Sequence, residues 1–255
     1  MIDVAQFVET GVSVVTRVSG LMLFTPFPGG AAVPPRIKAG LTLAITMLLV
    51  PRYGSQSVIA SGPGVAVWTL GSELAIGALM GFAVTMIFEA AQLAGHYAGL
   101  QVGFSLVNII DPQTQVETPV LATLHQMIVL LIFLQLNVDH WLIRGLAQSF
   151  EFLPAGAIFT GQRIFQAVAY SAGGIFVCGV QIAAPILLAT MVADVALGFV
   201  SKVSPQLQVL YLGFPIKTVL ALLVWMGALA YWPSRFERYF TSAVTMGERF
   251  LRLAQ

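Results

Sequence analysis

The sequence predicts an all-α, polytopic membrane protein built from hydrophobic helical hairpins, with kinked or broken helices and a central loop. Hydrophobic residues make up 58% of the 255 residues and charged residues only 9%, whereas a typical globular domain is about 25% charged. Several apolar segments approach or exceed the roughly 20 residues that a helix needs to cross a bilayer. The net charge of +1 excludes the basic surface that nucleic-acid binding requires, so no nucleic-acid partner is expected.

Residues 1–255 are expected to form a single membrane-embedded domain, whose first hairpin lies within residues 1–64. Residues 4–25 form an apolar helical pattern with Arg17 inside it, and the sequence TPFPGGAAVPP that follows predicts a turn. The next apolar segment, residues 39–50, is too short to cross a bilayer alone. We therefore expect it to pair with the preceding helix as a hairpin or re-entrant segment.

The second hairpin, residues 65–137, begins with one long helical pattern over residues 65–100. At 100° per residue, five whole turns separate residues 77 and 95, so four glycines fall on one narrow stripe. These glycines are Gly77, Gly81, Gly95 and Gly99. Small residues four positions apart let a neighbouring helix approach closely. The stripe therefore predicts a helix-packing surface.

A polar stripe lies about a quarter turn from the glycines on the same predicted helix. Glu89, Gln92 and His96 are spaced three and four apart and share one face. Ionisable groups at membrane depth usually face protein or water. We expect this stripe either to line an ion path or to form hydrogen bonds between helices. The second interpretation is favoured, because Glu73 lies on a different side of the helix and the ionisable side chains form no continuous path.

Residues 99–119, GLQVGFSLVNIIDPQTQVETP, interrupt the middle of the chain. Proline disfavours helix in the residue before it, so Asp111 and Pro112 predict a helix end. Backbone freed in this way must face protein or a water-filled passage. An apolar run on a glycine-hinged loop is typical of a plug, and the alternative is an ordinary connecting loop.

The third region, residues 138–255, contains two predicted interruptions. Uncharged residues 164–193 exceed one perpendicular span, which predicts a break at residues 172–174 or at Pro185. A second interruption is expected at residues 213–215, within the apolar helix at residues 209–232. Before these helices, residues 137–156 mix charged and aromatic side chains, and the chain ends in a basic tail. Both segments are predicted to be amphipathic.

The sequence offers no catalytic or metal-binding constellation. It contains neither a Gly-x-Ser-x-Gly nor a His-Glu-x-x-His motif, and His96, His125 and His140 lack metal-ligand spacing. We therefore expect no catalytic residues, no metal, no cofactor and no enzyme activity. Asp194, at the end of an apolar stretch, is expected to be interfacial or paired with a lysine such as Lys202 rather than to carry protons.

Four segments in order give the chain a specific resemblance to a known family. They are FTPFPGGAAVPPRIKAGLTLAIT, GLQVGFSLVNIIDPQTQVETPVL, LNVDHWLIRGLAQSFEFLPAG and ADVALGFVSKVSPQLQVLYLGFPIKTVLAL. Over nearly its whole length, the chain resembles the FliR family of flagellar export-gate proteins and, more distantly, the corresponding proteins of injectisome type III secretion systems.

The resemblance implies a role in exporting unfolded flagellar proteins at the basal body in the bacterial inner membrane. It implies a hetero-oligomer with FliP and FliQ, joined by FlhA and FlhB, and contact with membrane lipid. It also implies that the central loop seals the channel through Phe104, Leu106, Ile109 and Ile110, with Asp111 and Pro112 ending the helix before it. An injectisome export-apparatus protein and a small-solute transporter with paired broken helices remain alternatives.

Overall fold

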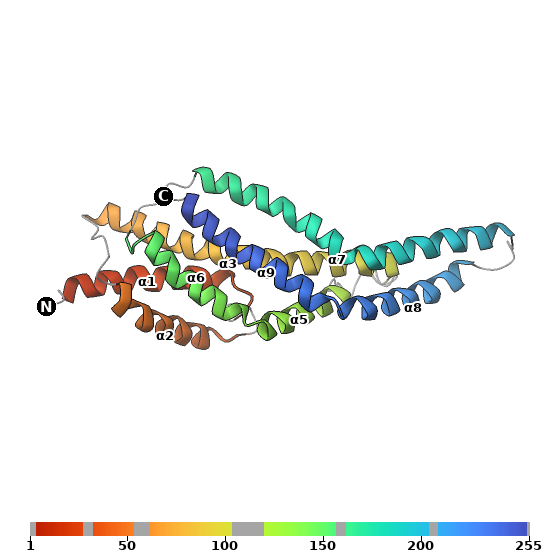
Figure 1. The fold of residues 1–255 in the computed structure, drawn as a ribbon, viewed down its shortest axis with the longest axis horizontal. Helices are drawn as coiled ribbons and strands as arrows, with labels where there is room; N and C mark the ends of the chain where they lie inside the picture. The colour runs from red at the N-terminus through yellow and green to blue at the C-terminus, as the bar shows by residue number, and fades with distance from the viewer. Residues whose placement is uncertain are drawn as a thin grey trace, which may run out of the picture. The chain divides into compact units, whose positions relative to one another are not determined.

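The computed structural model describes residues 4–27, 33–53, 62–103, 120–156, 162–203 and 209–253. Within these ranges every regular element is an α-helix (Figure 1), which confirms the all-α prediction. The helices are α1 (Val4–Phe24), α2 (Pro35–Tyr53), α3 (Pro63–Val102), α5 (Val120–Gln135), α6 (Val138–Phe152), α7 (Gln162–Val203), α8 (Val209–Leu229) and α9 (Trp232–Leu253).

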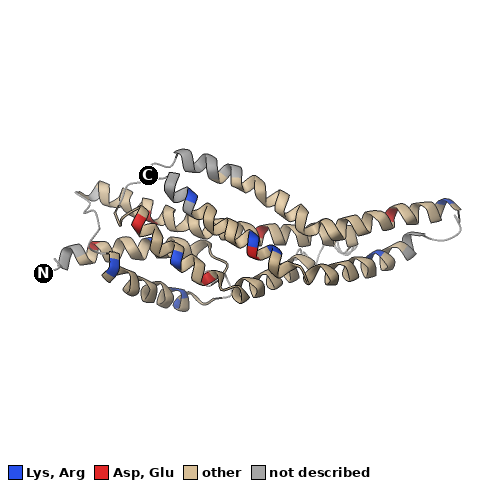
Figure 2. Ribbon diagram, in the orientation of Figure 1, with Lys and Arg blue, Asp and Glu red and all other residues tan. Residues whose placement is uncertain are grey.

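Three of the described helices are long and apolar enough to cross a membrane. Their qualifying segments are Phe7–Phe24 in α1, Gly64–Val102 in α3 and Ser171–Val203 in α7. The pairs α5–α6 and α8–α9 are each interrupted by a short break, and counting each pair as one span gives up to 5 spans. Figure 2 shows how sparsely Lys, Arg, Asp and Glu are distributed along these helices. The polytopic membrane character is therefore confirmed.

The interruptions predicted inside the two long apolar segments of the third region are absent. α7 runs without interruption through residues 172–174 and Pro185, and α8 runs through Gly213 and Pro215, so the breaks predicted there are wrong. An interior proline removes one donor, and membrane helices tolerate this where neighbouring groups satisfy the freed carbonyl. A break follows α5 at residue 137, where the sequence indicated that one segment ends and the next begins, and Asn137 there adopts the left-handed conformation with φ 52°.

The chain divides into two compact units. The first comprises Met1–Ile87, Phe133–Ala172 and Tyr239–Gln255, and the second comprises Phe88–Ile132 and Gly173–Arg238. The division of the sequence into hairpins at residues 64 and 137 stays a prediction.

In the first unit, α1, the beginning of α3 and α6 supply most of the core. α6 buries one face along its whole length, including Val138, Leu142, Leu146 and Phe150, at the spacing that an amphipathic helix requires. This confirms the prediction that residues 137–156 are amphipathic.

In the second unit, the later half of α3 packs through small side chains. Ala90, Ala91, Ala94 and Ala98 are completely buried, so helix backbones can approach this face closely. The opposite face of this half is exposed and includes the predicted polar stripe.

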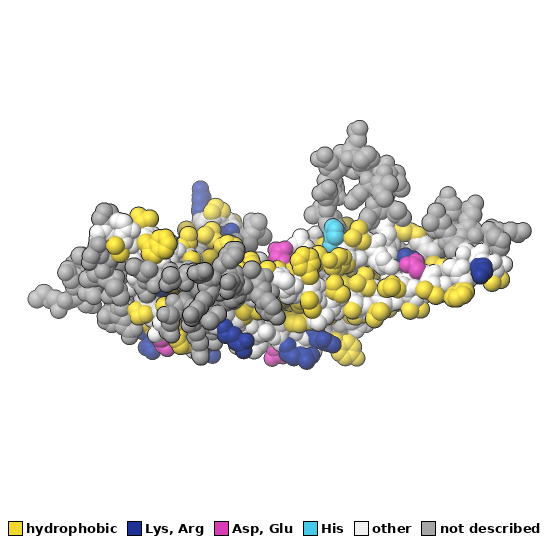
Figure 3. All heavy atoms as spheres, turned by 90° about the horizontal axis from the view of Figure 1, so that it is seen from above, with side chains coloured by type: hydrophobic (Ala, Val, Ile, Leu, Met, Phe, Trp, Pro, Cys, Tyr) yellow, Lys and Arg dark blue, Asp and Glu magenta, His cyan; other side chains and the backbone are white. Residues whose placement is uncertain are grey.

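Large apolar side chains remain on the surface of both units. Met47 and Leu48 of α2 are 73% and 78% exposed, and Val203 of α7 is 82% exposed. Figure 3 shows hydrophobic side chains over much of the visible described surface. A soluble monomer rarely exposes this much contiguous apolar area, so these surfaces suit lipid or protein neighbours.

Candidate functional site: a glycine-lined interface and a buried ion pair

Gly77 and Gly81 of α3 lie directly against the backbone of α1. A Cβ atom added to Gly77 would overlap the carbonyl oxygen of Arg17 and lie 2.8 Å from the backbone nitrogen of Leu21. A Cβ on Gly81 would lie 2.7 Å from the carbonyl oxygen of Leu21. Because backbone atoms cannot rotate away as a flexible side chain can, any side chain at these positions separates the two helices.

The same interface contains a glycine on α1 that sequence reasoning missed. A Cβ on Gly20 would overlap the carbonyl oxygen of Leu74 and lie 2.9 Å from the backbone nitrogen of Ala78. The approach is therefore reciprocal, with small residues on both helices. Gly20 has no second glycine four positions away in α1, so its sequence spacing gives no signal.

The later half of the glycine stripe faces a different helix. A Cβ on Gly95 would lie 2.5 Å from the Cα atom of Ala122 in α5, whereas one on Gly99 would lie 4.0 Å from the Cβ atom of Leu121. The stripe thus meets α1 in the first unit and α5 in the second. Only Gly99 among the four has ordinary van der Waals space for a methyl group.

A buried ion pair joins α1, α3 and the end of α6. Arg17 Nε donates to Glu73 Oε2 at 2.5 Å, and neither side chain is exposed. The guanidinium also donates from Nη1 to Ser149 Oγ at 3.0 Å and from Nη2 to the carbonyl oxygen of Leu153 at 2.9 Å. The other carboxylate oxygen, Glu73 Oε1, accepts from the backbone nitrogen of Gly156 at 2.8 Å.

Aromatic rings enclose this ion pair on one side. The Arg17 guanidinium carbon lies 4.0 Å from the centroid of the Phe150 ring, within the range of a cation–π interaction. Phe150 stacks in turn on Tyr53 of α2, with centroids 5.5 Å apart. The sequence does contain a signal for this pair, because a charged residue within an apolar helix is costly unless it is paired. Periodicity alone does not show that Arg17 and Glu73 are partners.

The polar stripe does not join this network. Glu89, Gln92 and His96 share one face of α3 as predicted, and all three are exposed in the described structure. The buried acid of α3 is Glu73, on another side of the helix. Whether the stripe has a role in export therefore stays a prediction.

The second unit holds its own ion pair. Lys217 Nζ of α8 lies 2.7 Å from Asp194 Oδ1, and Gln101 Nε2 of α3 donates to Asp194 Oδ2 at 3.2 Å. The Asp194 side chain is 47% exposed. Asp194 is therefore lysine-paired as expected, although with Lys217 of the next helix instead of Lys202.

His125 is enclosed by aromatic rings in the second unit. Its Nδ1 atom lies 2.8 Å from the carbonyl oxygen of Leu121, so Nδ1 carries the proton. Its ring stacks on Trp225 with centroids 5.6 Å apart and lies 5.0 Å from Trp232. In the part of the chain that the structure describes, no three His, Cys, Asp or Glu residues are grouped as a metal site.

The proposed seal lies outside the described residues, which end at Gly103 and resume at Val120. This applies to Phe104, Leu106, Ile109, Ile110, Asp111 and Pro112. In the described part, α3 ends at Val102: Gly103 has φ 95°, and its nitrogen donates to the carbonyl oxygens of Gly99 and Leu100, both at 3.1 Å. A left-handed glycine of this kind is a common helix terminus. The helix end expected at Asp111 and Pro112 stays a prediction.

Comparison with known proteins gives a consistent set of matches. The model of a family described as bacterial export proteins, family 1, matches residues 8–243. The chain is 32% identical over 200 residues to the flagellar biosynthetic protein FliR of Escherichia coli (strain K12), a match that covers 78% of this chain and 76% of the relative. It is 33% identical over 201 residues to FliR of Pectobacterium carotovorum subsp. carotovorum, with the same coverage of 78% and 76%. It is 30% identical over 155 residues to FliR of Bacillus subtilis (strain 168), with 60% of each chain covered.

Proposed function

We propose that this chain, which belongs to family 1 of the bacterial export proteins, is a component of the flagellar type III protein export gate in the bacterial inner membrane. The observation that carries the proposal is the family match over residues 8–243. The names of the relatives favour a flagellar system over an injectisome. The three to five candidate spans agree with a membrane location.

The proposed complex contains FliP and FliQ, with FlhA and FlhB joining it, at the flagellar basal body. The Asp194 side chain supports a protein neighbour, since it is 47% exposed within an apolar stretch of α7. A carboxylate facing lipid is costly, and such groups usually face protein or water. The exposed apolar side chains around it, including Val195 and Met191, suit the packing of further helices.

The proposed seal is the loop that begins after Gly103 and carries Phe104, Leu106, Ile109 and Ile110, with Asp111 and Pro112 behind them. Apolar side chains that meet across a narrow pore exclude water and ions. The left-handed Gly103 supports a change of chain direction at the base of this loop. The cargo would be unfolded flagellar subunits.

The proposed role is structural and involves no catalysis, metal or cofactor. The packing surface would be the glycine stripe, whose members Gly77, Gly81 and Gly95 leave no room for a Cβ atom. The Arg17–Glu73 pair would fix the helices that carry the first part of this stripe.

Co-purification tests the proposal. The tagged full chain, expressed at its native level and extracted in mild detergent, should retain several different membrane proteins identifiable by mass spectrometry. Recovery of the chain alone or as a symmetric oligomer would favour a transporter instead. Deleting the gene should abolish motility, and the wild-type gene should restore it.

A further inference from the structure

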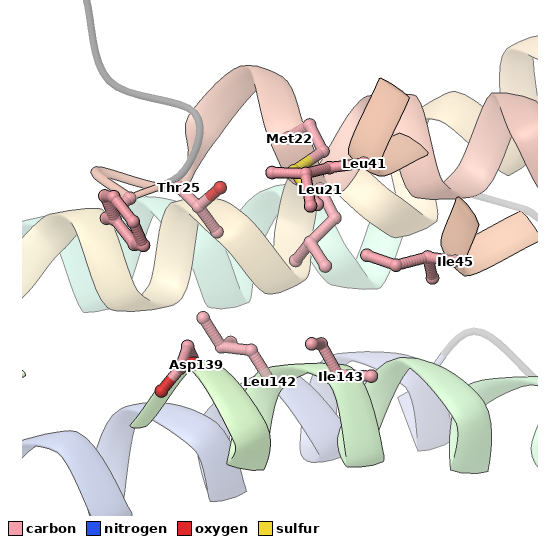
Figure 4. A pocket seen from close by; sticks show the side chains of 9 residues that line it. Leu21, Met22, Thr25, Leu41, Ile45, Asp139, Leu142 and Ile143 are labelled. Carbon is pink, nitrogen blue, oxygen red and sulfur yellow. The ribbon is translucent and has the colours of Figure 1, made fainter. Parts of the chain in front are cut away.

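Three buried side-chain atoms have no hydrogen-bond partner in the part of the chain that the structure describes. They are Thr25 Oγ1, His125 Nε2 and Trp225 Nε1. Thr25 belongs to the first unit, beside an apolar pocket of about 240 Å³ between α1, α2 and α6 (Figure 4). The other two atoms are on neighbouring rings of the second unit, His125 on α5 and Trp225 on α8. Buried polar atoms without a partner are rare and destabilising, and here two of them occur on adjacent rings.

The unpaired atoms of these two rings are chemically complementary. His125 Nδ1 donates to the carbonyl oxygen of Leu121 at 2.8 Å, which leaves Nε2 of the neutral ring as an acceptor. The indole Nε1–H of Trp225 can only donate. The rings are stacked, with centroids 5.6 Å apart and planes inclined by 28°. Because the N–H bond and the lone pair each lie in the plane of their own ring, the hydrogen bond requires an edge-to-edge arrangement instead.

His125 contacts both sides of the bend between α8 and α9. These helices are inclined by 64° across the break after Leu229. His125 stacks on Trp225 of α8, and its ring centroid lies 5.0 Å from that of Trp232 of α9. The two indoles are also in edge-to-face contact, with centroids 6.4 Å apart. In a straight helix, seven residues span about 10.5 Å along the axis, so straightening the bend would separate the indoles and release one side of the His125 ring.

We propose that His125, Trp225 and Trp232 form a two-state latch on the α8–α9 bend. In the bent state, His125 stacks on the indole of Trp225, and both nitrogen atoms stay unpaired within the described residues. In a straighter state, the rings move edge to edge and Trp225 Nε1 donates to His125 Nε2. Ring contacts favour the first state and the hydrogen bond favours the second by comparable amounts, so a neighbouring protein can select between them. The use of this latch in export rests on the proposed function, whereas its existence does not.

Distances across the bend test the latch. The variant Cys178→Ala, Val219→Cys, Arg238→Cys carries one spin label on each helix, because Cys178 is the only cysteine of the chain and both labelled positions are exposed. At about 1.5 Å per residue, these positions are about 28 Å apart in a straight helix and about 21 Å apart with the 64° bend. Double electron–electron resonance of the full chain, purified with its co-purifying proteins, should show both distances.

His125→Phe keeps an aromatic ring but removes the acceptor of the latch. It should lower the longer-distance population by about fivefold, the loss expected for one neutral hydrogen bond. His140→Phe is the matched control, because the His140 side chain is 70% exposed, and it should leave both populations unchanged. A single distance in the labelled parent, or an unchanged longer-distance population in His125→Phe, would overturn the latch.

Replacing Trp225 with benzothienylalanine separates the latch from ordinary packing. This residue keeps the shape of the indole and carries sulfur in place of N–H. Since an unpaired donor is removed from the bent state, the thermal midpoint should rise by about 2–4 °C, while the longer-distance population falls. The same replacement of Trp68, which is 60% exposed, should change neither quantity. A lower midpoint with an unchanged longer-distance population would show that the indole N–H is only structural and would overturn the latch.

Swimming tests the link between the latch and export. Cells that carry His125→Phe should swim less than cells with His140→Phe, because the straighter state is depleted. Full swimming despite a depleted longer-distance population would overturn the use of the latch in export. It would leave the proposed function standing, which deletion of the gene tests separately.

Discussion

Arg17 and Glu73, 56 positions apart in the chain, form an ion pair in which neither side chain is exposed. Removing two charges from water costs several kcal/mol for each ion, and a buried pair is stable only if the remaining donors and acceptors are satisfied. Ser149, Leu153 and Gly156 provide those partners. The network therefore holds α1, α3 and the end of α6 in one arrangement.

Removing one member of this pair should be more harmful than removing both. Arg17→Met leaves a buried carboxylate without its cation and should lower the free energy of unfolding by about 3–5 kcal/mol. The double variant Arg17→Met, Glu73→Met should recover part of this loss, because no buried charge remains. Thermal unfolding of the purified chain in detergent measures both effects.

The control is Arg144→Met, since Arg144 is exposed on α6 and should change stability by less than about 0.5 kcal/mol. Glu73→Met completes the cycle, and if the losses of the two single variants simply add up in the double variant, the charges are not coupled.

Gly81→Leu should separate α1 from α3. Even the first side-chain atom would lie 2.7 Å from the carbonyl oxygen of Leu21, and overpacking of this kind costs about 1–3 kcal/mol or more. The expected result is weaker assembly, measured as a loss of co-purified partners. Gly71→Leu on the same helix is the matched control, because a Cβ there meets no atom within 4 Å. An intact complex with Gly81→Leu would argue against a packing role.

Glu89→Gln should leave export unchanged. Glu89 is exposed on α3, and an amide keeps its hydrogen-bonding capacity while removing its charge, so the effect on stability should be within about 0.5 kcal/mol. Swimming motility of cells that carry the substitution measures export. Glu73→Gln, which removes the buried charge, should reduce motility in the same assay. Loss of motility with Glu89→Gln would indicate that the polar stripe needs its charge.

Removing residues 106–117 should open the channel to ions. The complex should still assemble, since the glycine and ion-pair contacts lie elsewhere, but the membrane should become permeable because the apolar side chains of the loop are absent. Ile109→Asp should act in the same direction more mildly by wetting the constriction. Whole-cell conductance or uptake of an excluded dye measures this, with Ile109→Val as the control. If the complex assembles with the deletion and the membrane stays impermeable, the loop is a connector.

Periodicity predicted the helices well where one face is buried. α3 begins at Pro63 and ends at Val102, close to the predicted residues 65–100, and α6 buries the face that its amphipathic pattern indicates. The breaks predicted at residues 172–174 or Pro185 and at residues 213–215 were wrong, since α7 and α8 continue through them. A helix can continue past a proline where neighbouring groups compensate for the lost hydrogen bond. That compensation depends on tertiary contacts, which are not encoded in local spacing.

Sequence patterns did not identify which residues pair with the charged side chains of the apolar helices. Spacing identified a lysine near Asp194 on its own helix, whereas the structure pairs it with Lys217 of α8. Glu73 was recognised only as lying off the polar stripe, and its cation comes from the first helix. Such pairings depend on how helices are arranged, so they require coordinates.

The contact between Gly156 and Glu73 would escape a mutational scan. The donor is a main-chain amide, so no truncation of a side chain at position 156 removes it. Gly156 has φ 88°, and an alanine there would report the conformational cost of that angle. Proline lacks the amide but fixes φ near −65°, so it confounds the two effects. Replacing residue 156 with glycolic acid exchanges its N–H for an ester oxygen and leaves the side chains unchanged. The change in unfolding free energy would then measure how much one backbone N–H stabilises the buried Glu73 carboxylate.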